Sequence, residues 1–444
     1  MGLSGQRTFV GFGFGAIQAG LFLYEAFHSG SFGRLVVAEV VPDVVAAVRR
    51  AGGCYAVNMA HLDRVEQADV GPIEIADPAV ETDREHLVSA IAQAEEIATA
   101  VPGVNFYASP APSSLHRLLA DGLRRKAAQH GPRAVVYVAE NHNRAAEILE
   151  EHVLSAIPES EREAVHGHVC FANTVIGKMS GVVADRAEAG QRLRPMTPDS
   201  RRAFLVEAFN RILISTIRFP PTAGSTPFCR GISVFEEKDD LLPFEEAKLY
   251  GHNATHALAA YVAALRGVQR MANLRQMPDM MRFLRAAFIE ESGQALRRRW
   301  AGVDPLFTPD GYAGYADDLL LRMTNPYLLD TVERVGRDPQ RKLGWDDRLI
   351  GTLRLAVREG VTPRRYAIGA AAALASLHPT LLSDDGGSID ARWGREGSRL
   401  LTALWAGEEG EQTEKEAVLD LVAAGLRRLQ AWRAAGYREL EACI

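Results

Sequence analysis

The sequence has few cysteines, no long uninterrupted apolar run and no excess of charge of one sign. Its 4 cysteines lie far apart without a CxxC pair, so neither a zinc knuckle nor a dense disulfide framework is expected. The two longest stretches without a formal charge, 8–24 and 366–383, are interrupted by glycines and Gln18 in one and by His378 and Pro379 in the other. Neither is typical of a membrane span, and the start of the chain lacks a signal-peptide pattern, so we expect a cytoplasmic protein.

The charges are close to balance. Fifty Lys and Arg against 56 Asp and Glu leave a formal net charge of −6, which argues against nucleic acid or an anionic membrane as the main partner. With 47% hydrophobic and 24% charged residues in 444, the composition is that of a globular protein large enough for two domains. We therefore expect a small-molecule partner, and we interpret the glutamate-rich run 407–416 as a solvated loop.

The first third of the chain has the pattern of an α/β fold. Short runs rich in valine and isoleucine, without polar alternation, are separated by amphipathic stretches, which is what a parallel sheet covered on both faces requires. The runs predicted as strands are Thr8–Phe12, Leu35–Ala38, Ile73–Ile75, Ile97–Val101 and Ala134–Val138.

Beyond about residue 200 the pattern becomes helical, with apolar residues spaced three and four apart. The segment 187–200, which contains glycine, prolines and charges, is the expected boundary, with the next helix starting at Pro198–Ser200. We place the junction near residue 195, giving domains 1–195 and 196–444. The stretches predicted as helical are Arg201–Ile217, Lys248–Leu265, Met280–Trp300 and Leu349–Leu377.

A glycine-rich turn follows the first predicted strand and leads into an apolar helix, which is where a dinucleotide fold binds phosphate. Glycine permits a tight turn and a close approach of backbone N–H groups to a pyrophosphate at the helix amino terminus. Gln18 stands where a third glycine normally allows close helix packing. The residues expected at the cofactor are Gly13, Phe14, Gly15, Ala16, Ile17 and Gln18.

The second predicted strand ends at Glu39, whose carboxylate can accept hydrogen bonds from the hydroxyls of an adenosine ribose. Val40, Val41 and Pro42 follow it, without an arginine that could hold a ribose phosphate. This pattern favours NAD over NADP. Two alternatives remain open: the glycines serve only helix packing, or the sheet binds S-adenosylmethionine or a flavin.

Lys248, Asn253 and His256 fall in one run that continues into the Ala-rich stretch Ala257–Leu265. On an α-helix the three side chains lie within an arc of about 140°. Such a trio suits alcohol oxidation, because a base must remove the hydroxyl proton while amides hold the oxygen as charge develops. Taken alone, Lys248 also suits a surface lysine and His256 a core histidine. His252 and His256 are spaced i, i+4, but the glutamate of a zincin is missing, so no metal is expected.

The K-x4-N-x2-H spacing of this run resembles the signature of the polyol-specific long-chain dehydrogenases, most closely their mannitol-1-phosphate 5-dehydrogenase branch. Further segments that resemble this family occur in the family's order along the chain, on both sides of this run, over residues 8 to about 377. They are Glu140-Asn141, Phe171-Ala172-Asn173, Glu291-Ser292-Gly293, Asn325-Pro326-Tyr327-Leu328, Val332-Glu333-Arg334-Val335, Arg341-Lys342-Leu343 and Asp347-Arg348-Leu349-Ile350.

The resemblance implies a Rossmann-type α/β amino-terminal domain, a mostly α-helical carboxyl-terminal substrate domain, and metal-independent hydride transfer in the cleft between them. It implies that Lys248 is the general base and that Asn141 and Asn253 polarise the substrate oxygen. Thr99 and Val101 are similar to residues beside the nicotinamide ribose. The implied substrate contacts are His256, Arg334, Lys342 and Asn173.

The sequence departs from the mannitol phosphate branch at Gln18, Asn173 and Lys178 and in the extension after Leu377. Without the resemblance, Thr331–Arg348 would be interpreted as an ordinary solvated surface.

The resemblance implies an NAD-dependent enzyme that interconverts a polyol, best represented by mannitol 1-phosphate, and a ketose, fructose 6-phosphate. The alternatives are a dehydrogenase for a free polyol or a sugar acid, of the mannitol 2-dehydrogenase or tagaturonate and fructuronate reductase types. A different alternative is a nucleotide-binding protein without turnover, against which the joint presence of Lys248, Asn253 and Asn141 argues.

Overall fold

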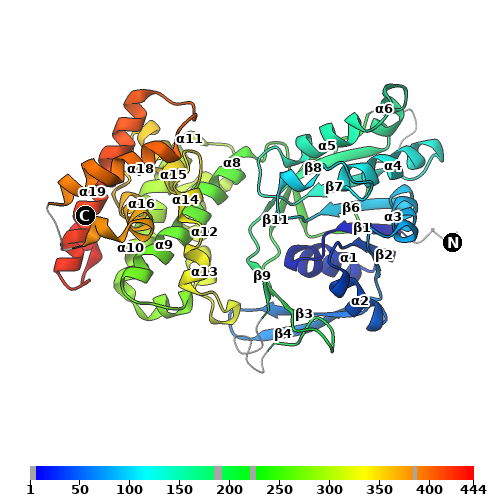
Figure 1. Cartoon of the computed structure of the whole chain (residues 1–444), viewed down its shortest axis with the longest axis horizontal. Helices are drawn as coiled ribbons and strands as arrows, with labels where there is room; N and C mark the ends of the chain where they lie inside the picture. The colour runs from blue at the N-terminus through cyan, green and yellow to red at the C-terminus, as the bar shows by residue number, and fades with distance from the viewer. Residues whose placement is uncertain (1–6, 185–192, 221–226, 384–387) are drawn as a thin grey trace. The chain divides into compact units, whose positions relative to one another are not determined.

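The computed structural model describes residues 7–184, 193–220, 227–383 and 388–444, and the chain divides into two compact units, Met1–Leu241 and Leu242–Ile444 (Figure 1). This division differs from the expected boundary near residue 195, because residues 203–238 contribute strands to the sheets of unit 1. Part of the expected boundary segment, 187–192, lies outside the described residues.

Unit 1 is built on a sheet whose described strands have the order β5-β2-β1-β6-β7-β8-β11-β12. The strands from β5 to β8 are parallel, and numbered along the chain they have the 3-2-1-4-5-6 order of a dinucleotide-binding fold. This confirms the predicted α/β domain. The strands are β1 (Arg7–Phe12), β2 (Phe32–Ala38), β5 (Glu74–Ala76), β6 (Ala94–Thr99), β7 (Ala134–Val138), β8 (Val169–Ile176), β11 (Ile212–Ser215) and β12 (Phe235–Lys238).

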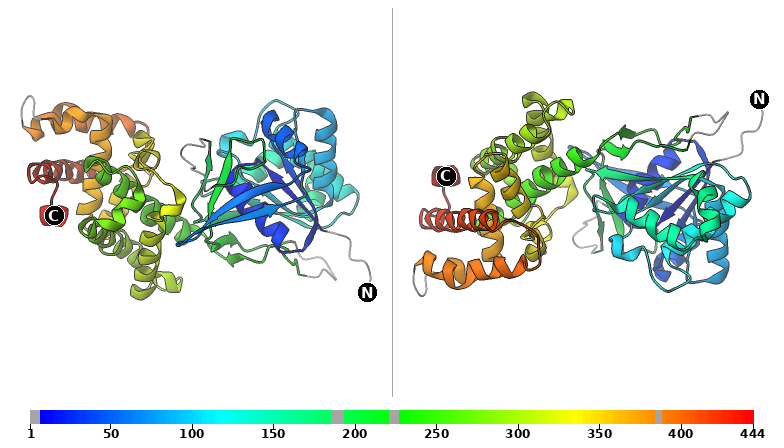
Figure 2. Two further views of the ribbon diagram at one scale, coloured as in Figure 1. Left: turned by 90° about the horizontal axis from the view of Figure 1, so that it is seen from below. Right: turned by 90° about the horizontal axis from the view of Figure 1, so that it is seen from above.

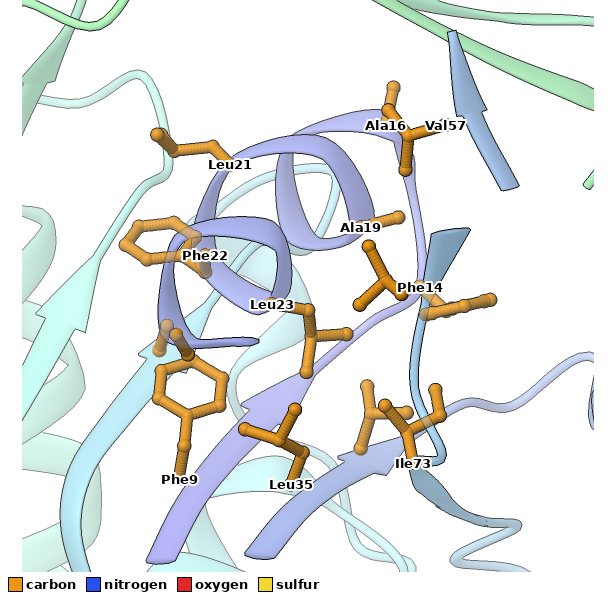
Figure 3. Packing of buried hydrophobic residues seen from close by; sticks show 14 of the residues in the cluster. Phe9, Phe14, Ala16, Ala19, Leu21, Phe22, Leu23, Leu35, Val57 and Ile73 are labelled. Atoms are coloured by element: carbon orange, nitrogen blue, oxygen red, sulfur yellow. The ribbon is translucent and has the colours of Figure 1, made fainter. Parts of the chain in front are cut away.

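Helices cover both faces of this sheet. Neighbouring strand residues point to opposite sides, and because both sets are apolar, both faces must be buried. Phe9 and Leu35 pack with the first helices on one face (Figure 3), whereas Val10 and Val36 pack on the other. Burying each such side chain contributes about 1.5–3 kcal/mol. The first face holds η1 (Gln18–Phe22), α1 (Leu23–His28) and α2 (Pro42–Arg50); the second holds α3 (Glu81–Gln93), α4 (Leu115–Ala128) and α5 (Ala145–Ser155).

A second sheet has the order β4-β3-β10-β9. Its strand β10 (Ala203–Glu207), together with β11 of the main sheet, occupies the stretch Arg201–Ile217, so the predicted helix there is wrong, as is its start at Pro198–Ser200. The apolar spacing in this stretch comes from two short buried strands, and pairing of β10 with β3 and of β11 with β8 outweighs the local helical pattern. The other strands are β3 (Tyr55–Ala60), β4 (Val65–Val70) and β9 (Ser180–Val183).

Unit 2 is built from helices, which confirms the prediction for this half, and Figure 2 shows α19 in red at its carboxyl-terminal end. Helix α16 packs against both α9 and α19. Of the described helices, none combines the length and hydropathy that a bilayer crossing demands. The main helices are α9 (Ala254–Leu265), α10 (Pro278–Ala286), α11 (Gly293–Arg299), α12 (Pro309–Met323), α13 (Val332–Gly336), α14 (Pro339–Lys342), α15 (Ile350–Arg358), α16 (Arg364–Leu377), α18 (Ser398–Leu404) and α19 (Gln412–Ala434).

Close packing in unit 2 depends on glycine at helix crossings. A Cβ on Gly369 would lie 2.6 Å from Leu258 Cδ1, and one on Gly425 would lie 2.3 Å from the carbonyl oxygen of Ala367. The second contact is with backbone, which cannot move aside as a side-chain tip can. These two positions therefore let α16 approach α9 on one side and α19 on the other.

Candidate active site

Each unit holds one group of candidate residues. In unit 1 the turn after β1 requires Gly13, because its φ is +80° and a Cβ there would lie 2.8 Å from the carbonyl oxygen of Ala100. The Glu39 carboxylate, directly after β2, accepts hydrogen bonds from the backbone N–H groups of Phe14 (2.8 Å) and Val41 (2.8 Å). The structure thus brings the glycine turn and the expected ribose-binding carboxylate together.

Gln18 lies in a different environment from the one its place in the motif indicates. Its side chain is fully buried, and a Cβ on Gly11 of β1 would lie 2.2 Å from its Nε2 atom. Neither amide atom has a hydrogen-bond partner among the described residues. The side chain fills space that Gly11 leaves open, and the spacing Gly11-x-Gly13-x-x-Ala16 places a small residue at the third position of the fingerprint.

Thr99 and Val101, at the carboxyl end of β6, are held by a residue that sequence reasoning did not single out. The buried Glu140 carboxylate, just after β7, accepts hydrogen bonds from Thr99 Oγ1 (2.8 Å), Val101 N (2.7 Å) and Tyr107 Oη (2.6 Å). Burial raises the pKa of Glu140, and these three donors oppose the rise. Glu140 therefore orders the strand end expected at the nicotinamide ribose, and the Glu140-Asn141 pair was the available signal.

Asn141 and Asn173 differ in what their surroundings leave accessible. Asn141 is exposed at the carboxyl end of β7. Asn173 accepts a hydrogen bond from Ala146 N through Oδ1 (2.9 Å) and donates one to Glu147 through Nδ2 (2.9 Å), which ties β8 to the start of α5. A substrate would have to compete with these hydrogen bonds for the amide of Asn173.

In unit 2, Lys248 and Asn253 lie in the π-helix η4 (Ala247–Asn253), and not in the α-helix expected from the sequence. In a π-helix each N–H bonds five residues back, so a turn takes more residues than in an α-helix and side chains spaced i, i+5 lie closer together around the axis. The helix packs closely at Gly251, where a Cβ would lie 2.6 Å from the ring of Phe288 and 2.6 Å from the hydroxyl of Tyr312. The π-helical turn therefore brings Lys248 and Asn253 closer together around the helix axis than the predicted α-helix would.

The Lys248 amine has the electrostatics of a base. Burial lowers its pKa to about 8, Glu245 opposes that shift, and the guanidinium of Arg348 adds to it. At pH 7.4 a lysine with this pKa is neutral in about one molecule in five, against about one in a thousand for an unperturbed lysine. A usable fraction of the unprotonated amine is therefore present near neutral pH.

His256 begins the next turn and remains neutral. Burial, followed by Arg334, Arg348 and Lys342, lowers its pKa to about 3. Its Nε2 atom is buried and has no hydrogen-bond partner among the described residues. The His252 ring lies 6.4 Å from that of His256, and its pKa also falls well below the usual value because of burial.

Three cations, Arg334, Arg348 and Lys342, act on His256 and help to lower its pKa. Arg334 is partly exposed and forms an ion pair with the buried Asp330. Lys342 is only 3% exposed, which excludes the interpretation of this position as ordinary solvated surface, and its amine donates to the carbonyl oxygen of Arg337. Arg348, whose Nε lies 2.8 Å from Asp347 Oδ1, was missed by sequence reasoning although the segment containing it was noticed.

A buried network supports the helix that follows η4. The Glu291 carboxylate accepts hydrogen bonds from the backbone N–H groups of Arg365 (2.9 Å) and Tyr366 (3.1 Å) at the start of α16. The Tyr366 hydroxyl lies 2.6 Å from Thr255 Oγ1 and 3.0 Å from Ser292 Oγ. Thr255 directly precedes His256, so the Glu291-Ser292 segment positions the candidate helix through Tyr366.

Two family models match the chain: "Mannitol dehydrogenase Rossmann domain" over residues 7–222 and "Mannitol dehydrogenase C-terminal domain" over residues 240–387. Among solved structures, the Pseudomonas fluorescens mannitol 2-dehydrogenase ternary complex with NAD and D-mannitol is similar at 15% identity, covering 100% of this chain and 94% of that chain, with a TM-score of 0.66. A D-sorbitol dehydrogenase in substrate-free form is similar at 13% identity, covering 99% and 95%, with a TM-score of 0.72. At these identities the likeness to the solved structures shows a shared fold.

Proposed function

Because this chain belongs to the mannitol dehydrogenase family, we propose that it is an NAD-dependent dehydrogenase that interconverts a polyol and a ketose, with Lys248 as the general base. The observation that most supports this function is the Lys248 amine, whose pKa is lowered to about 8 in the π-helix that also carries Asn253. A lysine on a solvated surface has no reason for such a shift.

In this proposal each candidate residue has a separate role in alcohol oxidation. Lys248 Nζ accepts the hydroxyl proton, while the amides of Asn141 and Asn253 hold the oxygen as its negative charge develops. His256, neutral and with an unpartnered Nε2, binds a further hydroxyl of the substrate. Bound NAD supplies the acceptor for the hydride that leaves the carbinol carbon.

The turn of unit 1 fits a dinucleotide. Gly13 leaves no room for a side chain, Glu39 lies at the end of β2, and the helix that follows the turn begins with N–H groups of the kind that bind phosphate in dinucleotide folds. In this assignment Gly13 and Phe14 shape the turn, because their N–H groups donate to Ala38 O (2.9 Å) and to Glu39 (2.8 Å). The backbone of Gly15, Ala16, Ile17 and Gln18, whose own side chain is enclosed, contacts the pyrophosphate. Thr99 and Val101 lie at the ribose of the nicotinamide.

Cofactor choice tests the role of Glu39. Turnover should favour NAD over NADP by tenfold or more, about 1.4 kcal/mol, because the carboxylate accepts from ribose hydroxyls and repels a ribose phosphate. Comparing kcat/KM for the two cofactors measures this preference. Glu39→Ser and Glu39→Gln should both narrow it, whereas Asp43→Asn, an exposed change of equal charge, should not. Equal or better use of NADP by the parent would contradict the assignment.

The pH dependence follows from Lys248. Oxidation needs the neutral amine, so kcat/KM for the polyol should rise as pH increases through about 8, and ketose reduction should fall over the same range. Arg348→Gln removes a cation that lowers this pKa, so the midpoint should move to higher pH. Arg341→Gln is the control. A flat profile from pH 6 to 10 would rule out a titrating lysine base.

Within this function, the finer proposal is that the substrate is a polyol phosphate such as mannitol 1-phosphate. Arg334, Lys342 and Arg348 supply a density of positive charge that suits a doubly charged phosphate. A free polyol is the second candidate, favoured by the ion pairs Arg334–Asp330 and Arg348–Asp347, which neutralise two of these three cations.

One experiment tests the overall proposal. Purified protein is mixed with NAD and a panel of mannitol 1-phosphate, mannitol, sorbitol and related polyols, and NADH formation is followed by absorbance. Turnover of at least one polyol is expected. The absence of turnover with all of them and with the corresponding ketoses and sugar acids in reverse would leave a nucleotide-binding protein without catalysis.

A further inference from the structure

The carboxyl-terminal segment beyond residue 387, outside the matched family models, packs against the loop that contains Lys342. Two tryptophans connect them. Trp405, after α18, donates from Nε1 to the carbonyl oxygen of Leu343 (2.8 Å), the residue directly after Lys342. In the opposite direction, Trp345 donates from Nε1 to the carbonyl oxygen of Glu409 (2.9 Å).

The two indole rings pack against each other in the protein interior. Trp345 is 1% exposed and Trp405 is 2% exposed, and their ring centroids lie 4.9 Å apart. Gly410 lies against the Trp345 ring, where a Cβ would come within 2.9 Å of Cζ2. Residues 407–411 of the run 407–416 are exposed as predicted, yet their backbone accepts the hydrogen bond of a buried ring. Residues 412–416 begin α19, so the prediction of a solvated loop is wrong for them.

Charged groups anchor the same contact from α15 and α19. The Arg354 guanidinium lies 3.9 Å from the centroid of the Trp345 ring and donates to the carbonyl oxygen of that residue (3.0 Å). Glu414 of α19 accepts two hydrogen bonds from Arg358, at 2.6 and 2.9 Å. The start of α19 is thereby held against α15, which keeps residues 405–411 in place.

The position of Lys342 is set by backbone hydrogen bonds of the segment 337–349, which contains α14. It closes the short helix α14, with its N–H donating to Asp338 O (3.2 Å) and its carbonyl oxygen accepting from Leu349 N (3.3 Å). Its amine donates to the Arg337 carbonyl oxygen, inside the same loop. A shift of the Leu343 carbonyl would therefore move Lys342 and its amine together.

We propose that Trp405 is a positioning residue for Lys342: its indole N–H fixes the Leu343 carbonyl and thereby sets where the Lys342 amine meets the substrate. This inference rests on the proposed function, in which Lys342 binds substrate. Substrate-binding groups must be held within a fraction of an ångström, so losing one buried tether weakens binding without removing the base. The carboxyl-terminal segment would thus support the substrate site from behind Lys342.

The test is Trp405→Phe, which keeps an aromatic ring and removes the N–H. With the polyol that the parent oxidises, mannitol 1-phosphate or mannitol, KM should rise about tenfold, while kcat and KM for NAD stay within about twofold. Trp432→Phe is the matched control, because Trp432 is fully buried in α19 but its Nε1 has no hydrogen-bond partner among the described residues. The control should leave KM unchanged.

A double-variant cycle links the effect to Lys342. In a Lys342→Met background, Trp405→Phe should raise KM no further, because the group it positions is already gone. An unchanged KM in Trp405→Phe, equal effects of Trp405→Phe and Trp432→Phe, or full additivity with Lys342→Met would each overturn the inference. If Trp405→Phe does not fold, Trp345→Phe removes the reciprocal tether to Glu409 and is held to the same outcomes. Inactivity of the parent protein would instead overturn the proposed function.

Discussion

Replacing Lys248 with alanine should lower the rate of alcohol oxidation by about 10² to 10⁴ while leaving NADH binding nearly intact. The reason is that the variant loses the only group assigned to accept the hydroxyl proton, while the turn of unit 1 that is proposed to bind the dinucleotide is unchanged. Steady-state oxidation kinetics and NADH titration by fluorescence measure the two quantities. Added primary amines should restore part of the rate, because they can accept the proton in place of Lys248.

The matched control is Lys238→Ala, which removes a lysine of β12 in unit 1 that forms an ion pair with Glu236. It should retain the parent rate. Oxidation by Lys248→Ala within a factor of three of the parent would show that the general-base assignment is wrong. A large loss of NADH binding together with the rate would indicate a damaged fold, which the control and the melting temperature would reveal.

Mannitol 1-phosphate should exceed mannitol in kcat/KM by at least 10²-fold, a difference of about 2.7 kcal/mol. Charge-assisted hydrogen bonds from Arg334 and Lys342 to a phosphate would supply this difference, and the fork of arginine can bind two oxygens at once. Arg334→Ala should lose most of the preference, mainly through KM, if the contact is equal in the ground and transition states.

The Arg334–Asp330 ion pair gives this prediction a second variant. Asp330→Asn releases the guanidinium from its carboxylate, so it should strengthen binding of the phosphorylated substrate and leave mannitol unaffected. Arg270→Ala, in the same unit, is the control. Comparable kcat/KM values for the two substrates would point to a free polyol enzyme. Activity only with tagaturonate or fructuronate would place the protein with the sugar acid reductases.

The sequence by itself determined the features that depend on local pattern. The buried strands β1, β2, β5, β6 and β7 were predictable because apolar runs between helical periods require a covered parallel sheet. The helical character of unit 2 was predictable in the same way. The run from Lys248 to His256 was recognisable because its residue types and spacing are specific, whatever conformation they adopt.

Only the tertiary structure decided the features that depend on partners distant in the chain. Arg201–Ile217 forms strands because β3 and β8 pair with it, which no local periodicity reveals, and for the same reason unit 1 extends to Leu241. The π-helix at Lys248 packs at Gly251 against Phe288 and Tyr312, residues distant in the chain. Trp405 is linked to the segment that holds the buried Lys342 through the carbonyl of Leu343, 62 positions earlier in the chain. Such contacts are set by how the helices pack, because hydrogen bonding and desolvation act through space and not along the sequence.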